Sequence, residues 1–152
     1  MPLGGEALAR MQWYCQRGRP LVALRAGGGP TFAYWPQFDS DVLGIEAAGI
    51  VAASPGPLPI TPCAQAHPIL AETGTFESAG GLPQGIRLAQ DADVLLEGGG
   101  GDVSQPVAWT RSRGSARMFA TALGQPDDLV SPTVAELVLN AIRWVTHISH
   151  SA

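Results

Sequence analysis

A single histidine in the middle of the chain is the first candidate for proton transfer. His67 stands before Pro68 in a proline-rich stretch. An imidazole titrates near neutral pH, so this side chain could act as a general acid or base. No second histidine or clear carboxylate lies beside it in the sequence. A hydrogen-bonded structural histidine is therefore the competing interpretation, and the sequence favours it.

An arginine and two aromatic residues are candidates for binding a ligand. Arg25 directly follows the apolar run 21–24. Its guanidinium could hold a carboxylate, a phosphate or vicinal hydroxyls, and the alternative is an ion pair with an acidic neighbour. Tyr34 and Trp35 follow on the next loop. Their rings could stack on a sugar ring, or they could form a hydrophobic plug over a sheet.

Three polar side chains after the stretch 116–122 complete the candidate site. Gln125 can hydrogen-bond a hydroxyl group but cannot move a proton at neutral pH. Asp127 could bind sugar hydroxyls, and Asp128 could serve as a catalytic base. The alternative is that both carboxylates belong to a solvated turn before the final helix.

Two helices and a few short strands must position these residues. Apolar residues at spacings of three and four predict a helix over 6–17, ended by a left-handed Gly18. Trp109 and Trp144 are assigned to the core. Strands are predicted over 21–24, 93–97, 107–110 and 118–121, the last two forming an antiparallel hairpin.

The final element has the clearest helical pattern. Ser131 or Thr133 can cap its start, Pro132 suits its first turn, and Thr133 with Glu136 fits a capping box. Its apolar stripe consists of Val134, Leu137, Val138, Ile142 and Val145. By contrast, residues 57–85 are rich in proline and glycine, and we expect irregular structure there.

The composition excludes several classes of function. All nine basic residues are arginines, which excludes a Schiff-base lysine and a phosphate-loop lysine. The net charge of −4 and the lack of an arginine run argue against a nucleic-acid partner. Cys15 and Cys63 form no C-x-x-C pair, and neither Cys63 nor any serine lies in a nucleophile motif. His147 and His150 are spaced like helical metal ligands but lie near a fraying chain end, so neither a metal nor a cofactor is predicted.

The chain reads as a single domain over residues 1–152. It is 45% hydrophobic, which supplies a core, and no apolar run approaches the roughly 18 residues of a membrane span. The first residues do not resemble a signal peptide, so we expect a cytoplasmic protein without a membrane partner. The order helix, buried strand, loop, strands and closing helix indicates the α/β class. Because the chain opens with a helix, we expect a sheet built on 21–24 to be short of flanking parallel strands.

Several segments together resemble the ThuA-like (trehalose utilisation) family. In the C-terminal third they are Gln105–Thr110, Ala116–Gly124 and the helix ending Asn140–Trp144. Nearer the start they are Gly18–Ala26, Trp35 with Phe38, Val42–Gly44 with Gly49, and His67–Ile69. The resemblance spans about residues 6–145. It implies a flavodoxin-like α/β sandwich related to class I glutamine amidotransferases, with a parallel central sheet and a hairpin near the C-terminus.

The chain departs from the family pattern in two ways. Family members begin with about two further strands and a helix, so we expect the N-terminal strands to be missing. Arg25, Ile50 and Gln125 stand where the family has histidines, and His67 alone matches a signature histidine. These replacements argue against full activity.

The resemblance implies a role in carbohydrate metabolism. The first hypothesis is a domain that binds or processes a small-molecule sugar at the strand ends around Arg25, Trp35, His67 and Gln125. If it is an enzyme, it would be a hydrolase or isomerase using His67 and an aspartate. The second hypothesis is a non-catalytic module that binds sugar or mediates assembly. A third alternative is a homo-oligomer formed through an unpaired strand edge.

Overall fold

The computed structural model describes most of the chain. The described residues are 5–27, 30–47, 58–63, 66–78, 82–83, 85–98, 104–113 and 116–147. The helices among them are α1 (Gly5–Gln16), α2 (Phe38–Asp41), the short 3₁₀ helix η1 (Pro68–Leu70), α3 (Pro126–Leu129) and α4 (Pro132–Val145). The strands are β1 (Leu21–Ala23), β2 (Ile45–Ala47), β3 (Leu58–Pro62), β4 (Phe76–Ser78), β5 (Arg87–Leu88), β6 (Asp93–Gly98), β7 (Gln105–Arg113) and β8 (Ala116–Thr121).

A six-stranded sheet in the order β1-β8-β7-β6-β3-β4 forms the centre of the fold. Only β1 and β8 pair in parallel, and the other four ladders are antiparallel. The predicted α/β class is thus confirmed, whereas the predicted parallel central sheet is not. The two-residue connection between β7 and β8 accounts for one of these antiparallel ladders, because adjacent strands joined by so few residues must run antiparallel.

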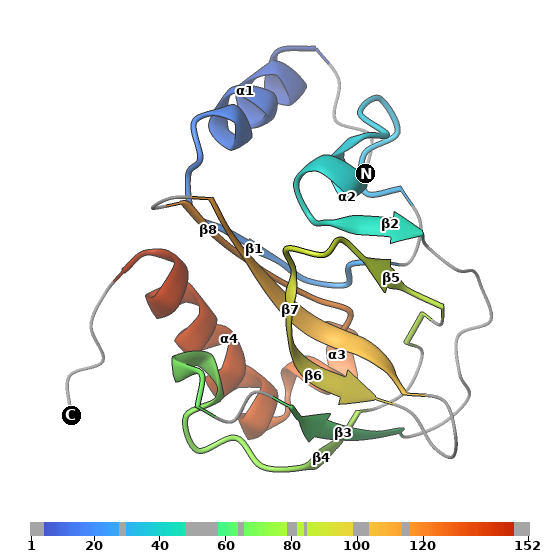
Figure 1. The fold of residues 1–152 in the computed structure, drawn as a ribbon, viewed down its shortest axis with the longest axis vertical. Helices are drawn as coiled ribbons and strands as arrows, with labels where there is room; N and C mark the ends of the chain where they lie inside the picture. The colour runs from blue at the N-terminus through green and yellow to red at the C-terminus, as the bar shows by residue number, and fades with distance from the viewer. Residues whose placement is uncertain are drawn as a thin grey trace.

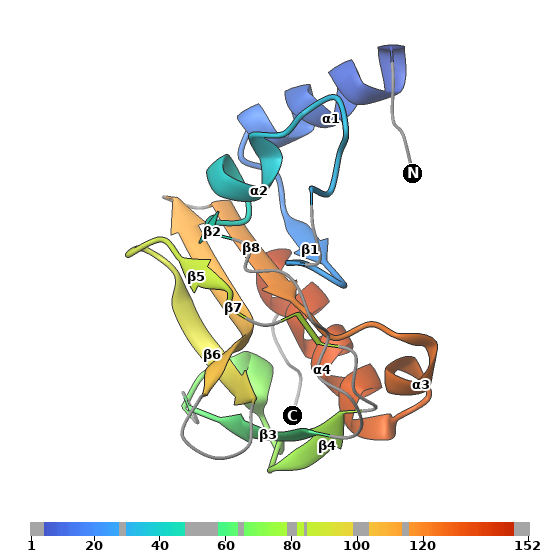
Figure 2. The same cartoon turned by 90° about the vertical axis from the view of Figure 1, so that its right-hand side faces the viewer.

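The two faces of this sheet carry different layers. Helix α4 packs against β8, β1 and η1 on one face, while α2 and the small β2–β5 sheet cover the other (Figure 1). Helix α1 lies beyond the end of the sheet where β1 and β8 begin, close to α2 (Figure 2). Side chains alternate between the two faces along each strand, which assigns each strand residue to one layer.

The predicted hairpin is confirmed, and it carries the centre of the core. Ala108 pairs with Thr121 and Arg113 with Ala116, so β7 and β8 are in register along the whole hairpin. Trp109 on β7 is fully buried, as predicted, and its Nε1 donates to the carbonyl of Leu43 at 2.8 Å. This bond ties the β2 layer to the centre of the sheet.

The closing helix begins where predicted, with one correction to its buried stripe. Pro132 is its first residue and Ser131 its N-cap, although the Ser131 side chain makes no capping bond. Val134, Leu137, Ala141 and Val145 face the sheet, and Asn140 is buried beside them with its Nδ2 donating to the carbonyl of Ile69 at 3.2 Å. Ile142, predicted in the stripe, is instead 43% exposed. It lies about 100° around the helix from Ala141, at the edge of the buried face.

The expectation of irregular structure over residues 57–85 is wrong for two segments. β3 and β4 lie there as antiparallel neighbours. Two prolines fit within β3 because its partners are staggered. Pro59 pairs only with β4, and Pro62 only with β6. Each proline therefore has one neighbouring strand, which leaves room for a residue that has no N–H to donate.

Candidate functional site

Arg25 occupies a strained turn directly after β1. Its φ is 59°, in the left-handed region that side-chain-bearing residues rarely adopt. Two backbone bonds hold the turn against β8, from the Arg25 amide to the Leu123 carbonyl and from the Ala26 amide to the Thr121 carbonyl, both at 2.9 Å. The exposed Arg25 side chain is thus presented at the carboxyl ends of the sheet's one parallel strand pair. Ligands of open α/β sheets bind at that end of parallel strands.

Gly124 makes the close approach of the two strand ends possible. Its φ is 138°, and a Cβ placed there would lie 2.8 Å from Cγ of Arg25 and 3.2 Å from Cβ of Leu24. A larger residue would have to displace Arg25. The lack of a side chain at Gly124 therefore permits the observed position of the Arg25 side chain.

The two aspartates of α3 have different environments. Asp128 is 2% exposed, and its Oδ2 accepts from the amides of Gly124 and Gln125, each at 3.3 Å. This carboxylate closes the turn that carries Gly124. Asp127 is exposed on the same short helix, and Gln125 is half-buried at its start. The structure therefore gathers Arg25, Gln125, Asp127 and Asp128 at one end of the sheet.

No carboxylate neutralises Arg25 within the described part of the chain. The ion pairs found there join Arg10 with Glu6 and Arg111 with Asp91. The ion pair considered as the alternative for Arg25 is thus absent from the residues described. With no ion-pair partner among the described residues, the exposed guanidinium is available to an anionic or hydroxylated ligand.

The two aromatic candidates lie on the layer that contains α2. The Trp35 ring stacks on Phe32 at 6.1 Å and meets Phe38 edge-on at 5.1 Å, so it forms part of a half-buried aromatic cluster. Phe38 begins α2, and the carbonyl of the last α2 residue accepts from Arg111 toward the end of β7. Trp35 therefore has the contacts of a hydrophobic plug. Tyr34 beside it is 68% exposed.

His67 lies on the opposite face and at the opposite end of the sheet. Its Nδ1 accepts from the Ile69 amide at 3.2 Å and caps η1, and its ring lies 4.9 Å from that of Trp144. Trp144 also receives the Arg117 guanidinium, 4.6 Å from its ring. Burial lowers the pKa of His67 below its ordinary value; the positive charge of Arg117 adds to this effect, and the negative charge of Asp93 opposes it.

His67 does not join Arg25 and Gln125 in one site. Arg117 stands near the start of β8, and Leu123 follows its end. At about 3.3 Å per residue these positions are roughly 20 Å apart. The predicted roles of His67 and Asp128 as catalytic groups stay predictions, but the structure places the two side chains at different ends of the strand.

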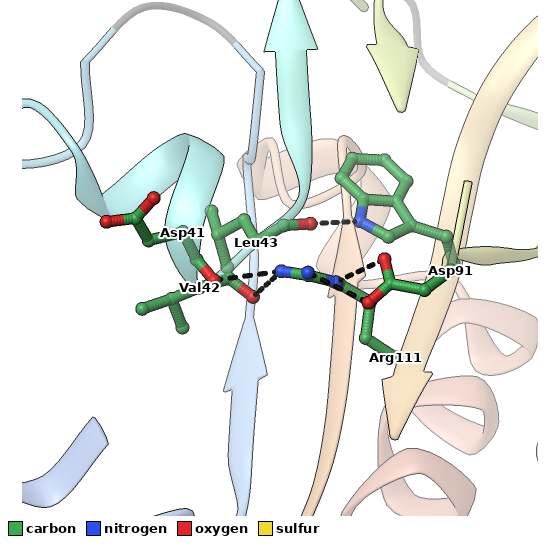
Figure 3. Close-up of polar contacts among 6 residues, drawn as sticks. Asp41, Val42, Leu43, Asp91 and Arg111 are labelled. Carbon is green, nitrogen blue, oxygen red and sulfur yellow. Dashed lines mark hydrogen bonds and ion pairs between the residues drawn. The ribbon is translucent and has the colours of Figure 1, made fainter. Parts of the chain in front are cut away.

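Sequence reasoning missed Arg111, which fastens the second layer to the sheet (Figure 3). Its guanidinium makes a two-pronged pair with Asp91 at 3.0 Å, and its Nη1 donates to the carbonyls of Asp41 at 2.9 Å and Val42 at 3.1 Å. Arg111 itself is 8% exposed. The alternation of side chains along a strand was the signal that could have revealed Arg111. Arg111 stands two residues after Trp109 on the same strand, so both side chains face the same layer.

No cluster of three metal-ligating side chains occurs in the described ranges. His147 is exposed after α4, while His150 and Ile50 lie outside the described residues. None of the described helices is long and apolar enough to cross a membrane.

Comparison with known proteins places the chain among ThuA-like proteins. The family model described as trehalose utilisation matches residues 3–145. A solved ThuA-like protein from Bacteroides uniformis superposes with a TM-score of 0.71 at 21% sequence identity. The match covers 95% of this chain and 66% of that one, so this chain spans about two thirds of its solved relative. The comparison with curated proteins finds no match.

Proposed function

Because the chain belongs to the ThuA (trehalose utilisation) family, we propose that it binds a sugar derivative where β1 and β8 end. The family implies a role in carbohydrate utilisation. Within that role, Arg25 is the principal contact, and Gln125 and Asp127 bind hydroxyl groups beside it.

The proposal rests on the exposure, the ion pairing and the backbone conformation of Arg25. The side chain is exposed, it has no carboxylate partner in the described ranges, and its backbone is held in a conformation that costs about 1–3 kcal/mol. Strain of this kind persists where the surrounding structure over-determines it, as at ligand-binding positions. A guanidinium binds carboxylates and phosphates through two parallel bonds, so an acidic sugar or a sugar phosphate fits best.

The geometry supports binding rather than proton transfer at this end. Asp128 already accepts from two backbone amides, and both described histidines, His67 and His147, belong to the other end of the sheet. Asp127 is the one exposed carboxylate of α3, and a single carboxylate supplies a base without an acid. The non-catalytic hypothesis is therefore the one we prefer.

Calorimetric titration tests the proposal. Glucuronate and glucose 6-phosphate should bind more tightly than trehalose. Arg25→Ala should weaken them at least about tenfold, because a hydrogen bond to a charged group contributes about 1.5–3 kcal/mol. Arg10→Ala is the matched control: it removes an exposed arginine of α1 and should leave the affinity unchanged.

Two results would contradict the proposal. One is unchanged binding by Arg25→Ala. The other is wild-type binding of inorganic phosphate as tight as that of glucose 6-phosphate, since the site would then recognise the anion and not the sugar.

A second candidate function, assembly, is supported by the position of β1. This strand is an edge of the six-stranded sheet, and the Leu24 that follows it is 40% exposed. An open edge can pair with another chain. Sedimentation over a range of concentrations should then show association, and a monomer throughout would refute this candidate.

A further inference from the structure

A hollow on the α4 face lies apart from Arg25, beside the start of β6. Its volume is about 630 Å³. It is lined by the segment that enters η1 and by the first residues of β6, namely Ala66, His67, Pro68, Ala92, Asp93, Val94 and Leu95. Five of these side chains are apolar, so His67 and Asp93 are the two that can make directed bonds in it.

His67 is held in one tautomer with its second nitrogen available. Because Nδ1 accepts from the Ile69 amide, the neutral ring carries its hydrogen on Nε2. Contact with the Trp144 ring at 4.9 Å, and of Trp144 with Arg117, fixes the orientation of the imidazole. Nε2 has no hydrogen-bond acceptor among the described residues, so it can donate to a ligand.

Asp93 supplies the complementary acceptor. Its carboxylate is exposed at the first position of β6, and it is close enough for its charge to act on His67. Arg117 does not line the hollow, and its charge acts on the pKa of His67 in the opposite sense to that of Asp93. The hollow therefore combines one N–H donor, one carboxylate and apolar walls, with no cationic side chain among its lining residues. That combination favours a ligand that is uncharged and carries several hydroxyl groups.

We propose that this hollow binds the ring of a neutral polyhydroxylated ligand, such as a hexose unit. Nε2–H of His67 donates to one hydroxyl, and Asp93 accepts from one or two others. The apolar lining packs against the C–H face of the ring. This site is separate from the one at Arg25, to which we assign an acidic sugar derivative, and it does not depend on that assignment.

The side-chain nitrogen spectrum of His67 tests the proposal with methyl α-glucoside as the probe. We expect a saturable shift of the Nε2 resonance, with a dissociation constant of about 1–10 mM, as is typical of a small ligand held by few bonds. Asp93→Asn should weaken binding at least about tenfold. Glu136→Gln makes the same chemical change on an exposed position of α4 and should have no effect, and neither should Arg25→Ala.

Three outcomes would overturn the proposal. The first is the lack of a saturable shift at His67 in the wild-type protein. The second is undiminished binding by Asp93→Asn. The third is an equal shift with tert-butanol, which has a single hydroxyl, because the hollow would then be a general apolar site. The exposure of Asp93 makes its substitution compatible with folding, and the amide spectrum of the variant verifies this.

Discussion

Replacing Arg111 by methionine should loosen the α2 and β2–β5 layer. Methionine keeps an apolar stem of similar length but removes the guanidinium. Two consequences differ in size. The carbonyls of Asp41 and Val42 lose the Arg111 donor; each of these bonds is charge-assisted and half-buried and contributes about 1–3 kcal/mol, so their loss costs about 2–6 kcal/mol. The carboxylate of Asp91 loses its partner too, but its side chain is 50% exposed and water replaces the bond at a cost of about 0–1 kcal/mol.

Urea denaturation separates these two contributions. Arg111→Met should lower the free energy of unfolding by about 2–6 kcal/mol with an unchanged slope, and Asp91→Asn should lower it by less, because the half-exposed asparagine amide oxygen can still accept from the guanidinium. Hydrogen exchange should accelerate in α2, β2 and β5 before it does in β6, β7 and β8. Equal costs for the two variants would refute the reasoning, because the ion pair and not the carbonyl bonds would then be what holds the layer.

Three further outcomes follow from the same structure. Gly124→Ala should lower stability by about 1–3 kcal/mol and weaken ligand binding at Arg25, since φ is 138° and the new Cβ would meet Arg25; Gly74→Ala, with open space around it, should be close to neutral in thermal unfolding. The lowered pKa of His67 means that the unfolded chain binds the proton more readily, so this residue's contribution to stability is complete above its ordinary value of 6.5 and declines as the pH falls toward the lower folded value. Melting temperatures measured between pH 8 and pH 5 should show that decline in the wild type and a smaller one in His67→Gln, and identical slopes would contradict the assignment. Burial and the nearby charge of Glu97 raise the pKa of Cys63, so its alkylation at neutral pH should be slower than that of free cysteine despite its exposure; a faster rate would argue against the raised pKa.

The elements with strong local patterns were predictable from the sequence. Helix α1, strands β1 and β6, the β7–β8 hairpin and helix α4 all lie within a few residues of their predicted positions. Their signals are local, since periodicity, turn residues and a leading proline act over a few neighbours. β3 escaped prediction because its two prolines argue against a strand, and only its staggered pairing with β4 and β6 permits them.

The candidate site was predictable only in part. The sequence pattern predicted that Arg25 and Gln125 each follow a strand. The structure brings the ends of these two strands together through the parallel pairing of β1 with β8. The end of the sheet at which His67 lies depends on the path of the chain between distant elements, and no local sequence pattern encodes that path. Arg111 was missed because its hydrogen-bond partners, Asp91, Asp41 and Val42, are about 20 to 70 positions away in the sequence.

Backbone chemical-shift mapping with glucuronate locates the sugar-binding residues directly. We expect the largest saturable amide shifts to cluster in residues 24–26 and 121–128, around Arg25 and α3, and to disappear in Arg25→Ala. Shifts confined to another part of the chain, or shifts of the same size in Arg25→Ala, would contradict the claim that the paired ends of β1 and β8 form the sugar-binding site.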